Sequence, residues 1–181
     1  MAGAEAALDL ILMRIMDGLM AIPAILLAIA LVAVLGPSLV NVLVALTIIG
    51  WVGYARLVRG QVMKVREFEY VQAARALGAG TTRILLKHVI PAALPAVVVQ
   101  ATLGMAGAII GEASLSFLGL GVQPPTPEWG VMIRQGAESM VTGQWWIGVF
   151  PGIALILLSL GLNLAGDGLA DLLDPRRDAA S

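Results

Sequence analysis

The chain has no cysteine and only one histidine among its 181 residues, which removes several kinds of chemistry. Without thiols there is no disulfide framework, no thiolate zinc site and no cysteine nucleophile. One histidine does not make a multi-histidine metal site, so we expect none. The sequence also lacks the Gly-x-x-x-x-Gly-Lys-Ser/Thr loop that cradles nucleotide phosphates. We therefore expect a chain that is not an enzyme and carries no cofactor.

Charged residues are scarce, at 13% of the chain against about 25% in an ordinary soluble domain. Hydrophobic residues make up 59% and the mean hydropathy is +0.93, which indicates that the solvent is a lipid bilayer. The net charge of −1 gives no reason to expect a nucleic-acid partner. Residues 1–9 are small and acidic, and they lack the basic start and cleavage site of a signal peptide.

A transmembrane helix needs about 20 predominantly apolar residues, and four uncharged windows of the sequence qualify. They predict an all-α, polytopic membrane helix bundle, a single domain over residues 1–181. We expect about four transmembrane helices, with a turn at Gly36-Pro37-Ser38 and a kink at Pro23. The predicted spans are about 15–36, 38–57, 90–112 and 145–167.

The distribution of cations predicts the orientation of these spans. With four spans, the N-terminus, the loop at about 58–89 and the C-terminus share one side. All of the 11 Lys and Arg residues except Arg134 fall on that side, so we expect it to be cytoplasmic. The loop at about 115–143 is then extracytoplasmic. A large soluble helical core would instead scatter its charges over surface helices.

The cytoplasmic loop has the pattern of a helix, a glycine turn and a second helix. Val71, Ala74 and Leu77 fall at helical spacing and predict one apolar face. Gly78 suits the left-handed residue that ends a helix. Thr81 or Thr82 is expected to cap the second helix, and Pro91 to begin the next span. A solvated basic loop beside anionic lipid is the alternative reading.

The segment Tyr70-Val-Gln-Ala-Ala-Arg-Ala-Leu-Gly78, followed after nine residues by His88-Val-Ile-Pro91, resembles the "EAA" loop of ATP-binding-cassette importer permeases. In that family the loop docks on the ATPase subunit. The resemblance implies that small alanines sit in a groove of the ATPase and that the glycine fixes the turn. Gln72 stands where the family usually has Glu. The implied coupling residues are Gln72, Ala73, Ala74, Gly78, His88 and Pro91.

The segment from Gly111 to Gly130 and the ending Leu173-Asp-Pro-Arg176 are similar to the dipeptide, oligopeptide and nickel branch of that family. With the loop, the resemblance covers roughly residues 10–177. It implies a permease subunit of the cell inner membrane that imports dipeptides, oligopeptides or solutes such as nickel chelates. The implied partners are two ATP-binding subunits that hold ATP and Mg²⁺, a second homologous permease and an extracytoplasmic solute-binding protein.

Family members usually have six spans, so the chain is expected to lack the two N-terminal ones. Two other functions stay open beside the importer subunit. A truncated membrane scaffold would insert and fold without solute flux. A secondary transporter would need paired ionisable residues near the midplane in an inverted repeat, and the sequence shows no internal repeat.

Three polar residues near the far end of the third span are candidates for a translocation path or gate. A charge at mid-bilayer costs roughly 2.5–3.5 kcal/mol on insertion scales, so such charges tend to be functional. Glu112 either serves in the path or lies at the outer interface. Ser114 and Ser116 either line the path or satisfy backbone groups.

Overall fold

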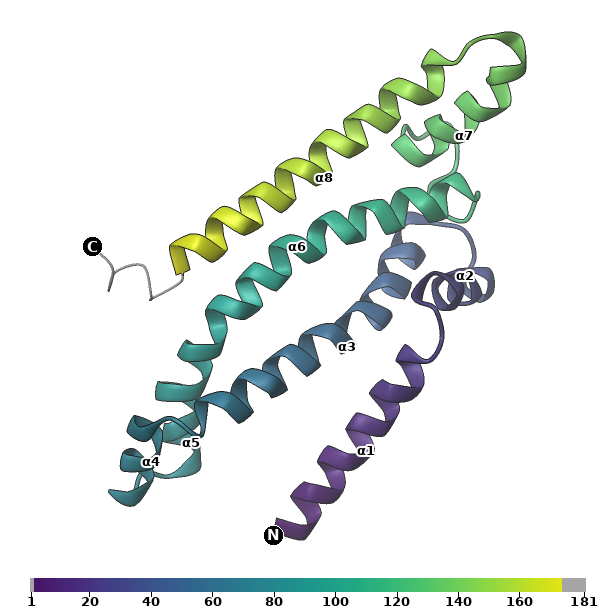
Figure 1. The fold of residues 1–181 in the computed structure, drawn as a ribbon. Helices are drawn as coiled ribbons and strands as arrows, with labels where there is room; N and C mark the ends of the chain where they lie inside the picture. Colours follow the sequence, from purple (N-terminus) through teal and green to yellow (C-terminus); the bar gives the residue numbers. More distant parts are fainter. Residues whose placement is uncertain (1, 174–181) are drawn as a thin grey trace. The chain divides into compact units, whose positions relative to one another are not determined.

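The computed structural model describes residues 2–173, and the side chains from residue 7 onward. Over these residues all of the regular secondary structure is helical, so the predicted all-α class is confirmed (Figure 1). The predicted motif residues from Asp174 to Arg177 lie outside the described part. The elements are α1 (Ala2–Met20), α2 (Ala24–Leu35), α3 (Leu39–Val65), α4 (Glu69–Ala76), α5 (Thr81–Ile84), the π-helical turn η1 (Leu85–Val89), α6 (Ile90–Phe117), α7 (Trp129–Ser139), the 3₁₀ turn η2 (Met140–Thr142) and α8 (Trp146–Leu173).

Within the part of the chain that the structure describes, three helical stretches are long and apolar enough to cross a membrane: α3, the continuous helix Thr81–Phe117, and α8. A fourth is the bent pair of α1 and α2, whose axes differ by 88°. The predicted first span, about 15–36, is therefore not one straight helix. Pro23 has no N–H to continue α1, and it serves as the N-cap of α2, where its carbonyl accepts from Leu26 and Leu27.

The chain forms two compact units, Met1–Val52 with Ala108–Leu155, and Gly53–Gly107 with Ile156–Ser181. In the first unit, a buried core joins α2, α3 and α6. Ala28 and Val32 from α2, Val42 and Ala45 from α3, and Leu115 from α6 make up this core. The predicted turn between α2 and α3 is observed. Its carbonyls at Leu35 and Gly36 accept hydrogen bonds from the Asn41 amide at 2.8 and 2.9 Å.

The second unit holds a smaller core that fixes α4. Val65 at the end of α3, Val71 on α4, Ile84 on α5 and Val89 on η1 are each at most 6% exposed and pack together. Burial of Val and Ile side chains of this kind stabilises by about 1.5–3 kcal/mol each. Helix α4 is therefore attached to α3 on one side and to the start of the Thr81–Phe117 helix on the other.

The start of the Thr81–Phe117 helix differs from the sequence prediction in two details. No threonine side chain caps α5; Gly80 is the N-cap residue, with no side-chain hydrogen bond. The helix itself begins before Pro91, because it runs on unbroken from Thr81. Just before Pro91 the helix widens into η1, where the Ile90 N–H donates to the Leu85 carbonyl five residues back.

Candidate functional site

Helix α4 is short, and local sequence and tertiary packing both support it. Glu69 in its first turn and Arg75 in its last turn carry the charges that the helix dipole favours at those ends. Eight residues are too few for a stable isolated helix, so α4 depends on its buried contact. That contact is Val71, which is 0% exposed. The opposite side of α4 is thereby left outside the core.

The C-terminal end of α4 is a complete Schellman motif. Gly78 has φ of 83°, the left-handed conformation that the sequence predicted for it. Its N–H donates to the Arg75 carbonyl, and the Ala79 N–H donates to the Ala74 carbonyl, both at 3.0 Å. These are the two bonds that define the motif. Glycine is needed here because a side chain at this φ costs roughly 1–2 kcal/mol.

The outward side of α4 is small and apolar. Ala73 is exposed and Ala74 is partly buried. Leu77 is 88% exposed, so of the three residues at helical spacing only Val71 is fully buried. Leu77 still donates an α-helical hydrogen bond to the Ala73 carbonyl, but six residues at about 100° each place it about 120° away from Val71 around the helix axis. A leucine therefore protrudes from the tip of a polar loop.

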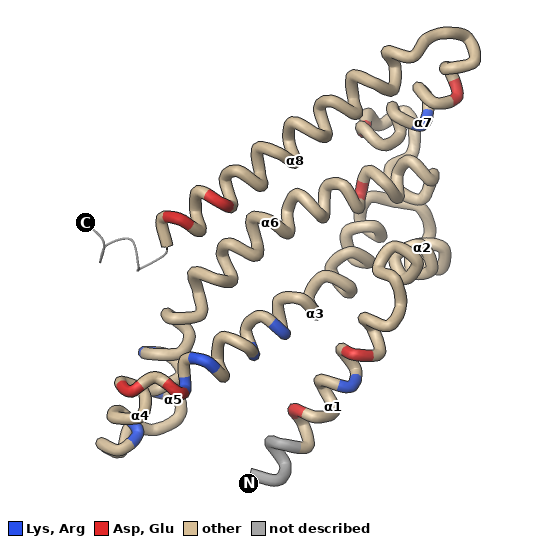
Figure 2. The backbone as a smooth tube through the Cα atoms, viewed as in Figure 1, with Lys and Arg blue, Asp and Glu red and all other residues tan. Residues whose placement is uncertain are grey.

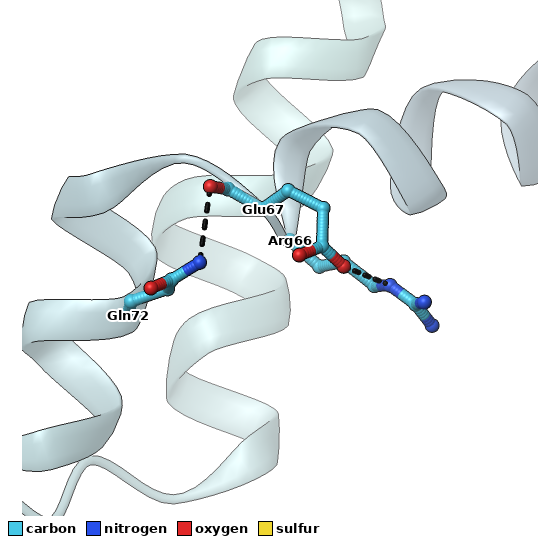
Figure 3. Close-up of polar contacts among 3 residues, drawn as sticks. All are labelled: Arg66, Glu67 and Gln72. Carbon is cyan, nitrogen blue, oxygen red and sulfur yellow. Dashed lines mark hydrogen bonds and ion pairs between the residues drawn. The ribbon is translucent and has the colours of Figure 1, made fainter.

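Gln72 fastens the first turn of α4 to the turn that follows α3. Its Nε2 donates to the main-chain carbonyl of Glu67 at 3.1 Å (Figure 3). The neighbouring Arg66 and Glu67 form an exposed ion pair at 2.9 Å. A glutamate at position 72 would be acceptor-only when ionised and would not make the bond to Glu67. The departure from the family's usual residue thus has a local structural role.

His88 and Pro91 lie where α4 meets the membrane helix. His88 belongs to η1, and its ring centroid is 5.7 Å from that of Tyr70 on α4. Tyr70 in turn lies 5.7 Å from Phe68. Pro91 is in the first turn of α6. The Tyr70–His88 contact was not predicted, although both residues belong to the loop segment that resembles the importer family.

Cations surround this part of the second unit. Figure 2 shows Lys and Arg on the second half of α3 and around α4 and α5. Positive charge of this kind is typical of a loop on the cytoplasmic side of a membrane. The cations from the end of α3 to η1 are Lys64, Arg66, Arg75, Arg83 and Lys87.

The polar residues at the end of α6 are engaged locally. The Ser114 hydroxyl donates to the Ile110 carbonyl at 2.7 Å. The Ser116 hydroxyl is fully buried, donates to Glu112 Oε1 at 2.8 Å and accepts the Val122 N–H at 3.1 Å. Ser116 therefore closes the turn that follows α6. Both serines satisfy nearby groups, which is the structural alternative that the sequence left open.

Helix α7 is seated closely on α6 and α8 within the first unit. Glu128 caps its N-terminus by accepting the Gly130 and Val131 N–H groups at 2.7 and 2.8 Å. The Gly130 backbone lies against the Ala113 carbonyl, with no room for a methyl group between them. Gly136 meets the Gly148 backbone in the same way. Within the described residues, no group of three or more potential ligands could hold a metal ion.

These features define an all-α membrane protein with an exposed, apolar-tipped helix attached to the start of a membrane-crossing helix. The family of binding-protein-dependent transport system inner membrane components matches residues 1–179. The chain belongs to this family, as the resemblance of its loop and second half implied. It is accordingly a component of an inner membrane.

Individual relatives agree. The chain is 46% identical over 166 residues to the di/tripeptide transport system permease protein DppC of Pseudomonas aeruginosa. The aligned residues make up 92% of this chain and 54% of the relative. It is 45% identical to the dipeptide transport system permease protein DppC of Bacillus subtilis, over 93% of this chain and 53% of the relative. It is 47% identical to the glutathione transport system permease protein GsiD of Shigella flexneri, over 93% and 55%. The chain spans about half the length of these curated relatives.

Proposed function

We propose that this chain is the membrane-spanning permease subunit of an ATP-driven importer and that α4 docks on a separate ATP-binding subunit. One observation carries this proposal: Leu77, 88% exposed, and exposed Ala73 project from a helix whose opposite side is anchored by fully buried Val71. An exposed leucine next to small residues suits a shallow apolar groove on a soluble partner, where its burial contributes about 1.5–3 kcal/mol.

The anchoring of α4 gives docking a mechanical consequence. Because Val71 packs with Val65 and Val89, a partner that displaces α4 also displaces the end of α3 and the start of the membrane helix. ATP binding closes the partner ATPases in this scheme, and the loop at about 58–89 transmits the closure to the spans. ATP and Mg²⁺ are held on the partner chains. This chain supplies the path and the moving helices.

The orientation in the membrane follows from charge. We place the loop with Lys64, Arg75 and Lys87 on the cytoplasmic side, together with both termini, and the segment at about 115–143 outside. The remaining importer components are proposed to be a second homologous permease, two ATP-binding subunits and an extracytoplasmic solute-binding protein. The spans proposed for the single permease domain are those at about 15–36, 38–57, 90–112 and 145–167, the first of them broken at Pro23.

The solute class that we propose is short peptides. Relatives that cover more than nine tenths of this chain carry the names of dipeptide, di/tripeptide and glutathione transport permeases. For the translocation path or gate we retain Glu112, whose carboxylate is held by Ser116 at 2.8 Å. Ser114 borders an open, mainly apolar pocket of about 390 Å³, with Ile25 and Phe117 among its other walls. In this proposal Ser116 positions the Glu112 carboxylate, and Ser114 is held by its bond to the Ile110 carbonyl.

The docking proposal is tested by changing the outward side of α4 without touching its core. Ala73→Trp places a bulky ring on the surface that would enter the groove, so we expect the ATPase encoded beside this chain to be lost from the purified membrane complex. The matched control is Ala92→Trp, at an exposed alanine in the first turn of α6. Equal recovery of the ATPase with both variants would contradict docking through α4.

A further inference from the structure

The connection between α4 and the membrane helix is unusual in its backbone. The five residues Leu85–Val89 form a π-helical turn between α5 and α6, with the Ile90 N–H bonded to the Leu85 carbonyl. Such turns are rare and hold one residue more than an α-helical turn. The turn precedes Pro91, which has no backbone N–H and therefore donates no α-helical hydrogen bond.

Two side-chain contacts join α4 to this wide turn. Val71 packs in the same buried cluster as Val89. Tyr70, the residue before Val71, places its ring 5.7 Å from the ring of His88, the residue before Val89, with the planes tilted by 52°. Helix α4 is thus connected to the turn through a shared buried cluster and through one direct ring contact. The packing of the valines is apolar and does not depend on orientation, whereas the contact of the two rings has a defined geometry.

We propose that the turn Leu85–Val89, held to α4 by the Tyr70–His88 ring contact, is the joint through which α4 moves the transmembrane helix α6. Tyr70 and His88 are positioning residues of this joint. This inference rests on the proposed docking of α4 for its source of motion. The joint itself is a property of this chain.

The wide turn suits such a role because its extra residue can shift along the helix. Each residue of an α-helix advances the chain by about 100° around the axis, so moving the extra residue by one position re-aims the side chains beyond it. A displacement of α4 reaches the turn at both Val89 and His88. The ring contact decides whether the turn follows α4 as a unit or yields independently of it.

The absence of cysteine from the chain allows this to be measured with two introduced labels. Spin labels at Ala76→Cys on α4 and Leu94→Cys on α6 occupy exposed positions within the second unit. In the purified chain alone we expect one narrow distance distribution. His88→Ala should broaden it, and His88→Phe, which keeps a ring, should restore it. Leu86→Ala changes an exposed residue of the same turn and is the matched control.

In the complex with the ATPase, a non-hydrolysable ATP analogue should shift the distance in the parent chain. His88→Ala should retain the ATPase but lose the shift, which a purely structural role of His88 would not predict. An unchanged narrow distribution in His88→Ala, or a full shift in that variant, would overturn the joint. If the parent chain retains no ATPase, the proposed docking fails, and the distributions in the chain alone still decide whether Tyr70 and His88 hold the joint.

Discussion

Replacement of Gly78 by proline is expected to abolish recovery of the ATPase with the purified chain. Proline holds φ near −65°, whereas Gly78 has φ of 83°, and proline also removes the N–H that donates to the Arg75 carbonyl. The Schellman motif would open and the last turn of α4 would unwind. Leu77, adjacent to Gly78, would then lose the position from which it projects. The measurement is co-purification of the ATPase from membranes.

The control for Gly78→Pro is Gly80→Ala in the same turn. Gly80 has φ of −66° and no heavy atom within 4 Å of an added methyl group, so alanine fits there. Gly78→Ala is an intermediate case, with an expected cost of roughly 1–2 kcal/mol for its left-handed backbone and partial recovery of the ATPase. Full recovery of the ATPase with Gly78→Pro would show that docking does not depend on the shape of this turn.

Replacement of Gly130 by alanine is expected to cause a large loss of stability. The added methyl group would overlap the carbonyl and Cα of Ala113, which are backbone atoms of α6 and cannot rotate away. Overpacking costs typically 1–3 kcal/mol and occasionally more. A loss of 3 kcal/mol corresponds to a fall of roughly 6–12 °C in Tm for a chain of this size. Thermal unfolding of the purified chain in detergent measures it.

Gly152→Ala on α8 is the matched control for Gly130→Ala, since nothing lies within 4 Å of its added methyl group. Its Tm should stay the same or rise, because alanine favours a helix interior over glycine by roughly 0.5–1 kcal/mol. Equal unfolding temperatures for Gly130→Ala and the parent chain would mean that α7 does not pack on α6 through this glycine.

Much of the fold was predictable because it depends on composition and local conformation. Uncharged windows report which segments prefer lipid, and they located α3, α6 and α8. Gly78 was identifiable because a glycine directly after a helical pattern commonly marks a left-handed helix end. The turn after α2 was predictable for a similar reason, since Gly36 and Pro37 both interrupt a helix. Each of these features is encoded within a few neighbouring residues.

The features that were not predicted depend on tertiary contacts or on the angles between helices. Hydropathy does not report the angle between helices, so the 88° bend at Pro23 was anticipated only as a kink. Helical spacing grouped Leu77 with Val71 and Ala74, but spacing alone does not show which of these side chains a neighbouring helix covers. The wide turn before Pro91 arises where Val89 is packed against α4, a contact that no local pattern encodes. The bond from Gln72 to Glu67 likewise needs the folded loop.

The most direct test of the central claim is cross-linking from Leu77→Cys, which would be the only cysteine in the chain. In membranes that contain the ATPase, we expect a short bifunctional reagent to join this cysteine to the ATPase. Val141→Cys is equally exposed, at 94% for the native residue, and lies in the segment proposed to face outward, so it should not cross-link to the ATPase. A cross-link from Val141→Cys, or none from Leu77→Cys in well-inserted protein, would contradict docking through α4.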